Sequence, residues 1–186
     1  MREGKLFIIS GASGVGKSTV LNMVMSARDD LQFSVSATTR KPRPGEQDGV
    51  QYYFVSTEQF QEMVKQNAFL EYDTHMNNSY GTPRFQVEEK VKTGHVILDI
   101  EPNGAFAVKE QWPDAKLIFI APPSQEELER RLRGRGDTPE DQVLVRLNRA
   151  AWEMTQKDKY DIIVINDEAK ACADRILNFI AENVKD

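Results

Sequence analysis

Four short apolar runs recur along the chain, and each is typical of a β-strand that is buried on both faces. They lie at residues 5–10, 95–100, 116–121 and 162–166 and consist mainly of Val, Ile, Leu and Phe. Continuous apolar runs of this length are typical of parallel strands, because helices cover both faces of a parallel sheet.

Helical patterns follow these runs. Residues 18–25 place Val20, Leu21 and Val24 on one side of a helix. Further along, Ser124 and Glu127 have the spacing of a capping box, which marks the start of a helix. Strands that alternate with helices predict an α/β fold with a parallel sheet covered on both faces.

Residues 33–83 interrupt this alternation. The segment is rich in turn-forming and aromatic residues, and Ser56 and Gln59 form a second possible capping box. The helix that follows carries Phe60, Met63 and Val64 on one face. We therefore expect an inserted α+β subdomain here.

Residues 126–149 form a second interruption, which is strongly polar and contains six arginines. Too few apolar residues are present to build a core, so we expect a mobile helical lid. The rest of a single domain then consists of residues 1–32, 84–125 and 150–186.

Composition limits what such a domain can bind. With 186 residues, 40% of them hydrophobic, the chain can build a core and is not disordered. Lys and Arg number 24 against 29 Asp and Glu, and the net charge of −5 disfavours binding to nucleic-acid polymers or anionic membranes. A single cysteine, Cys172, excludes an internal disulfide, and no apolar run approaches the ~20 residues of a membrane span. The N-terminus lacks the pattern of a signal peptide, so we expect a cytoplasmic protein.

A phosphate-binding loop is indicated by the motif Gly11-Ala12-Ser13-Gly14-Val15-Gly16-Lys17-Ser18. It fits G-x-x-x-x-G-K-[ST] and lies between a predicted buried strand and a predicted helix, as the mechanism requires. The loop's N–H groups and the helix N-terminus attract phosphate, Lys17 reaches the β- and γ-phosphates, and Ser18 can ligate Mg²⁺. The chain therefore contains a site for a nucleoside triphosphate, although this loop is common to hydrolases and transferases.

Longer motifs make the chain resemble the guanylate kinase family. They comprise residues 34–46, 48–55, 69–71 and 79–82, Tyr160-Asp161 and Asn166-Asp167, and the resemblance extends from about residue 4 to residue 181. It implies a P-loop nucleoside monophosphate kinase fold with a five-stranded parallel sheet, a GMP-binding subdomain at 33–83 and a lid at 126–149. It also implies transfer of the ATP γ-phosphate to GMP, and to dGMP, with Mg²⁺.

The resemblance assigns roles in GMP binding. Arg40 and Arg43 match the pair that binds the GMP phosphate, with the hydroxyls of Tyr52 and Tyr80. Glu71 matches the residue that recognises guanine, because a carboxylate accepts from the N1–H and 2-amino donors that adenine lacks. Three further positions match contacts to the base: Ser36, Thr82 and Glu101.

The resemblance also assigns roles in ATP binding and catalysis. Thr19 extends the phosphate loop, and Asn166 matches a residue near the adenine. Asp99, at the end of an apolar run, matches an acid that holds Mg²⁺ through water or positions an arginine. The catalytic residues that the resemblance implies are Lys17 and Arg40, together with the lid arginines Arg131, Arg135 and Arg146, which close over the phosphates.

Two other functions are compatible with these motifs. Some guanylate-kinase-like modules bind proteins and do not catalyse, but their phosphate loops are typically degraded, whereas Lys17 and Ser18 are present here. A P-loop kinase for another small acceptor is the second alternative. It is suggested by Glu101, where the family usually has Asp, and by Pro102 and Asn103 in the motif that follows.

Overall fold

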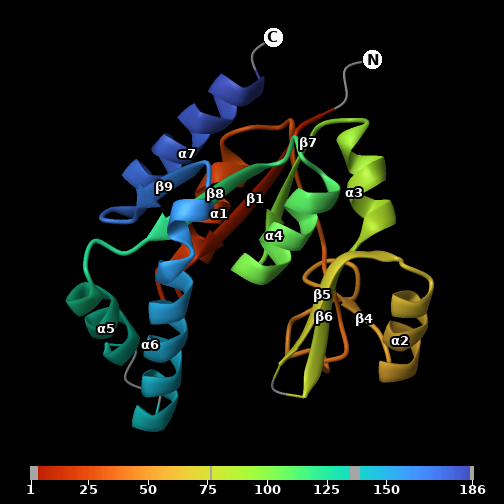
Figure 1. Ribbon diagram of the computed structural model, residues 1–186, viewed down its shortest axis with the longest axis horizontal. Coiled ribbons are helices and arrows are strands. Elements are labelled where there is room, and N and C mark those ends of the chain that lie inside the picture. Colours follow the sequence, from red (N-terminus) through yellow and green to blue (C-terminus); the bar gives the residue numbers. More distant parts are fainter. Residues whose placement is uncertain (1–3, 76, 135–138, 185–186) are drawn as a thin grey trace. The chain divides into compact units, whose positions relative to one another are not determined.

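The computed structural model describes residues 4–75, 77–134 and 139–184, and strands and helices alternate through most of them (Figure 1). One sheet has five strands, in the order β2 (Leu31–Phe33), β7 (His95–Asp99), β1 (Leu6–Gly11), β8 (Lys116–Ala121) and β9 (Ile162–Ile165). Within it β2 pairs with β7, and β8 pairs with both β1 and β9, all in parallel. The predicted α/β fold with a five-stranded parallel sheet is confirmed.

The chain divides into two compact units. Unit 1 comprises Met1–Leu6, Asp30–Leu98 and Asn103–Ala115; unit 2 comprises Phe7–Asp29, Asp99–Pro102 and Lys116–Asp186.

Unit 2 contains β8, β9 and all of β1 except Leu6. All six residues of β1 are buried, and Ile8 and Ile9 pair with Leu117 and Ile118 of β8. The helices α1 (Lys17–Ser26) and α7 (Ala169–Val184) pack against each other and bury Val20, Leu21 and Val24 on α1, as the sequence predicted. A short 3₁₀ helix, η1 (Lys157–Lys159), precedes β9.

The segment predicted as a lid contains α5 (Gln125–Arg133) and the first part of α6 (Glu140–Thr155), which lie side by side (Figure 1). Both are helical, as expected. The segment was expected to be too polar to build a core, but it does contribute buried residues, because Leu128, Leu132 and Val143 are each at most 3% exposed. These apolar residues are few, but they all fall on inward faces of amphipathic helices.

Only half of the predicted capping box at α5 is present. The Ser124 hydroxyl accepts a hydrogen bond from the Glu127 N–H at 3.1 Å. The Glu127 carboxylate does not reach back to the start of the helix, since it binds the guanidinium groups of Arg130 and Arg131. A guanidinium group is a charged donor, whereas the backbone N–H of a capping box is a neutral one, so the arginines bind the Glu127 carboxylate more strongly.

Unit 1 contains a four-stranded sheet of order β4 (Tyr53–Phe54), β3 (Ala37–Thr38), β6 (Asn78–Pro83) and β5 (Phe69–His75). Helix α2 (Thr57–Lys65) opens with the complete capping box of Ser56 and Gln59 that the sequence predicted. Its Phe60 stacks on Phe69 with ring centroids 4.6 Å apart, and Ala37 completes this small core. The unit also contains α3 (Arg84–Val91) and most of α4 (Pro102–Gln111).

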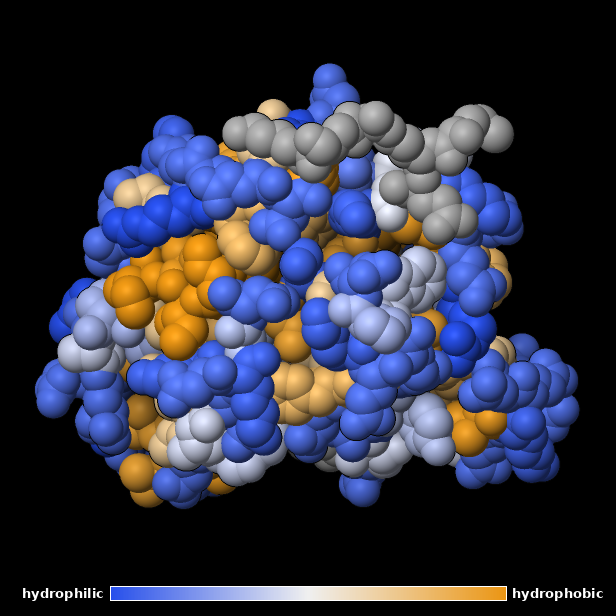
Figure 2. Space-filling view, turned by 45° about the horizontal axis from the view of Figure 1, so that its top comes forward, coloured by the Kyte–Doolittle hydropathy of each residue, from blue (hydrophilic) through white to orange (hydrophobic). Residues whose placement is uncertain are grey.

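Hydrophilic residues cover most of the face seen in Figure 2, where apolar residues gather in separate areas. Within the described part of the chain, no helix combines the length and the apolar character that crossing a membrane requires.

Candidate functional sites

The phosphate loop leads from β1 directly into α1, as its motif predicted. Gly14 and Gly16 have φ values of +85° and +90°, in the left-handed region that favours glycine. A side chain at Gly14 would also collide with Leu132, and one at Gly16 would lie 3.0 Å from the amide nitrogen of Asn166. Both glycines are therefore required by backbone conformation and by close packing.

Lys17, in the first turn of α1, forms an ion pair with Asp99. The Asp99 Oδ1 atom is buried and, among the described residues, has no hydrogen-bond partner apart from this ion pair. Ser18 follows Lys17 in the same turn. A hydroxyl and a carboxylate are oxygen ligands of the kind that Mg²⁺ prefers, so these residues fit such an ion. No group of three or more His, Cys, Asp or Glu side chains suited to a metal occurs within residues 4–75, 77–134 and 139–184.

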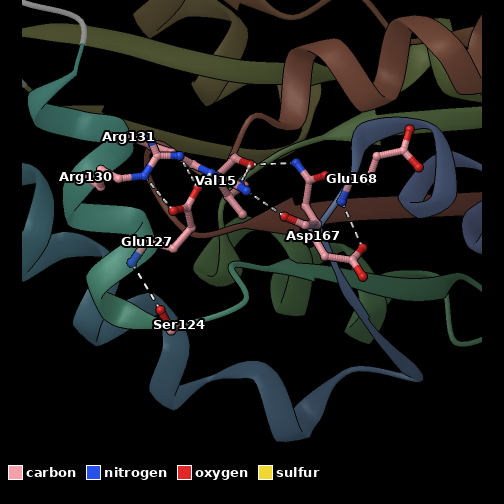
Figure 3. A network of polar contacts seen from close by, with 8 residues as sticks. Val15, Ser124, Glu127, Arg130, Arg131, Asp167 and Glu168 are labelled. Carbon is pink, nitrogen blue, oxygen red and sulfur yellow. Dashed lines mark hydrogen bonds and ion pairs between the residues drawn. The ribbon is translucent and has the colours of Figure 1, made fainter.

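The carbonyl of Val15, inside the loop, is held by two side chains that are distant in sequence (Figure 3). The Asn166 amide donates to it at 2.7 Å and Arg131 donates at 3.3 Å. Arg131 also donates to the Asn166 carbonyl at 3.1 Å. Glu127 orients Arg131, and hydrogen bonds from Arg130 and Arg131 lower the pKa of Glu127 from 4.5 to about 2. The structure thus brings Arg131 and Asn166 to the phosphate loop.

Helix α6 supplies a second lid arginine, since Arg146 Nε donates to Ser13 Oγ at 3.3 Å. The third, Arg135, lies outside the described residues. Glu101, which the resemblance placed at the base of GMP, lies in unit 2 and forms an ion pair with Arg149.

Unit 1 contains the other candidate GMP residues. Arg40 donates to both carboxylate oxygens of Glu46, at 2.9 and 3.0 Å, and this hydrogen bond raises the pKa of Arg40. The same carboxylate accepts from the backbone N–H of Arg43 at 2.7 Å. The Arg40 guanidinium also lies 5.4 Å from the ring centroid of Tyr52, whose ring is 6.0 Å from that of Tyr80. Arg40 and both tyrosines are therefore close together, and the exposed Arg43 lies on the same loop.

Glu71 on β5 pairs with Thr82 on β6 in the sheet. The Thr82 hydroxyl, almost completely buried, donates to Glu71 Oε1 at 2.5 Å. A methyl group added at Gly104 of α4 would lie 2.7 Å from the other oxygen, Oε2. A cavity of ≈ 300 Å³ is lined by Glu71, Asn103 and Gly104 among others. Ser36, half-buried just before β3, accepts the Tyr53 N–H on its carbonyl at 2.9 Å.

Sequence reasoning assigned no role to Glu46, Gly104 or Glu153. Glu46 could have been found from the sequence, because an acidic residue that closely follows Arg40 and Arg43 on one loop is a natural partner for their charges. Nothing in the sequence marks Gly104, since its importance depends on a contact with a residue 33 positions away.

Comparison with known proteins agrees with this architecture. The guanylate kinase family model matches residues 3–183. The guanylate kinase of Oceanobacillus iheyensis is 44% identical over 98% of this chain and 90% of its own length. That of Nostoc sp. is 47% identical over 94% of this chain and 88% of its own length.

A crystal structure of a guanylate kinase is also similar to this chain. The guanylate kinase of Anaplasma phagocytophilum matches with a TM-score of 0.79 at 34% identity, covering 98% of this chain and 88% of that one. Together with the phosphate loop and the paired arginines and tyrosines, these matches show that the chain belongs to the guanylate kinase family.

Proposed function

We propose that this protein transfers the γ-phosphate of ATP to GMP, and to dGMP, giving ADP and GDP or dGDP. The observation that carries the proposal is an intact phosphate loop, with left-handed Gly14 and Gly16 and the Lys17–Asp99 ion pair, in a chain of this family. A module that only binds proteins has no need for such a loop.

On the donor side, the N–H groups of residues 11–19 and the N-terminus of α1 would bind the triphosphate. Lys17 would leave Asp99 for the β- and γ-phosphates, where its charge is most needed. A phosphate oxygen of GMP attacks the γ-phosphorus in line, and the bond from that phosphorus to the β–γ bridging oxygen breaks, releasing ADP. Arg131 and Arg146 would neutralise the charge that spreads over the transferred group, and Asn166 would contact the adenine.

On the acceptor side, Arg40, Arg43, Tyr52 and Tyr80 would bind the GMP phosphate. Glu46 holds the Arg40 guanidinium in place, so less conformational entropy would be lost when the phosphate binds. The phosphate would replace part of this contact with a stronger, doubly charged one.

Glu71 would recognise guanine, and Ser36 and Thr82 would also contact the base. The Thr82 hydroxyl orients the carboxylate, which accepts from the N1–H and the 2-amino group of guanine. Adenine presents an acceptor at N1, and a site built around such pairing rejects the wrong base by about 10⁴-fold. Glu101, although paired with Arg149, is a candidate for an additional contact to the 2-amino group.

Magnesium is the expected cofactor, and Ser18 and Asp99 are the residues that would hold it, Asp99 through water. When bound with ATP, it would neutralise part of the charge on the β- and γ-phosphates. We further propose that residues 33–83 act as the GMP-binding subdomain and 126–149 as the lid, with Arg135 among its phosphate ligands, in a cytoplasmic enzyme that binds mononucleotides.

The proposal is tested by following ADP formation from ATP and Mg²⁺ with GMP, dGMP, AMP or UMP as acceptor. We expect turnover with GMP and dGMP, and a Lys17→Ala variant should lose activity by orders of magnitude at an unchanged melting temperature. Absence of turnover with every acceptor would favour a protein-binding module. Equal rates with AMP would contradict the role of Glu71, and a preference for UMP would indicate a kinase for another acceptor.

A further inference from the structure

A buried carboxylate lies behind the phosphate loop. Glu153, on α6, is only 3% exposed, and its Oε2 atom accepts a hydrogen bond from the backbone N–H of Ser13 at 2.7 Å. Burial raises the pKa of Glu153, whereas the Ser13 N–H and the charge of Arg149 oppose this rise. A charged group is kept in such a place only when it is paired and hydrogen-bonded, so the contact to the loop is a specific one.

The same face of α6 contacts Ser13 a second time. Arg146, seven residues before Glu153 and hence two helical turns away, donates to the Ser13 hydroxyl at 3.3 Å. Arg149 lies between these two residues on the helix. It donates to Glu153 at 3.4 Å and also pairs with Glu101, so it restricts the motion of the Glu153 carboxylate. Helix α6 thus forms hydrogen bonds with both the backbone and the side chain of Ser13.

We propose that Glu153 is a positioning residue of the phosphate loop. By fixing Ser13 it keeps the following N–H groups, from Gly14 onward, in the conformation that binds the triphosphate. This role presupposes the proposed function of the loop. The loop contains two glycines with positive φ, and such a backbone keeps one conformation only where its surroundings determine it. A loop that is ordered before binding loses less entropy when the nucleotide arrives.

Three variants separate positioning from a general effect on folding. Glu153→Ala removes the acceptor of the Ser13 N–H. Glu153→Asp keeps the charge but is one methylene shorter, whereas Glu153→Gln keeps an oxygen at full reach. Glu182→Ala, the same substitution at an exposed position of helix α7, is the matched control.

The readouts are kcat, KM for ATP and for GMP, the Kd of ADP from calorimetry, and the melting temperature. A hydrogen bond to a charged group corresponds to about tenfold or more in affinity. We expect KM for ATP and Kd for ADP to rise by about tenfold or more in Glu153→Ala and Glu153→Asp, while KM for GMP changes less than about twofold. Glu153→Gln should recover most of the affinity for ADP. If Glu153→Ala does not fold, Glu153→Asp and Glu153→Gln carry the comparison.

Wild-type affinity for ADP in the folded Ala or Asp variant would overturn the inference, as would an equal loss of affinity for GMP. The proposed function fails separately: it requires turnover of GMP by the wild type and its loss in Lys17→Ala. If both are observed while the Glu153 variants bind ADP normally, only the positioning role is wrong.

Discussion

Replacing Gly104 by alanine tests the guanine site through a residue that itself contacts no substrate in our proposal. Gly104 is the third residue of α4, and its added methyl group would lie 2.7 Å from Glu71 Oε2 and 3.0 Å from Glu71 Cδ. These separations are shorter than ordinary carbon–oxygen and carbon–carbon contacts, respectively. The atom in the way is the end of a flexible side chain, so the carboxylate moves and the backbone of α4 stays.

The change should affect recognition of guanine more than the stability of the fold. Alanine in a helix is about 0.5–1 kcal/mol more favourable than glycine, which offsets part of the strain of moving Glu71. Moving the carboxylate disturbs its 2.5 Å bond from Thr82 and its alignment with guanine. Hydrogen bonds to charged groups contribute about 1.5–3 kcal/mol each, so the loss of one corresponds to a rise of about 10- to 100-fold in KM for GMP.

The assay measures initial rates at saturating ATP with varied GMP, then at saturating GMP with varied ATP, next to thermal unfolding. We expect KM for GMP to rise, KM for ATP to stay within about twofold, and the melting temperature to change by a few degrees at most. Glu110→Ala, at an exposed position of the same helix, controls for the substitution itself. An unchanged KM for GMP in a folded Gly104→Ala variant would refute the reasoning.

Three further results are expected. Thr82→Val keeps the shape of the side chain but removes the donor to Glu71, so steady-state kinetics should show a KM for GMP raised about tenfold and an unchanged KM for ATP. Because the folded protein lowers the pKa of Glu127 from 4.5 to about 2, the stabilising charge pairing is complete above pH 4.5 and is lost as the pH falls toward 2. Urea unfolding should therefore show wild type and Glu127→Gln converging in stability over that range; a constant difference would contradict the pairing. Burial raises the pKa of the Cys172 thiol to about 11, so iodoacetamide at pH 8 should label the protein only after denaturation, as mass spectrometry would show.

Much of this architecture follows from local sequence. Buried parallel strands need unbroken apolar runs, and β1 and β8 show this pattern without help from distant residues. The phosphate loop is similarly local, because glycine conformations and a helix N-terminus make an anion site within a few residues. The start of α2 is also determined locally, because its capping box joins Ser56 and Gln59, which are three positions apart.

The parts that sequence reasoning missed depend on contacts between distant residues. It expected the composition of 126–149 to be too polar to build a core, yet Leu132 is buried and packs over Gly14.

The sequence by itself determined the fold class, the triphosphate loop and the family, since each depends on residues that are close together in the chain. Only the tertiary structure decided what surrounds the reactive groups: Glu153 behind Ser13, 140 residues away, and Gly104 against Glu71. The physical reason is that a hydrogen bond or a steric contact depends on separation in space, which a one-dimensional pattern does not contain.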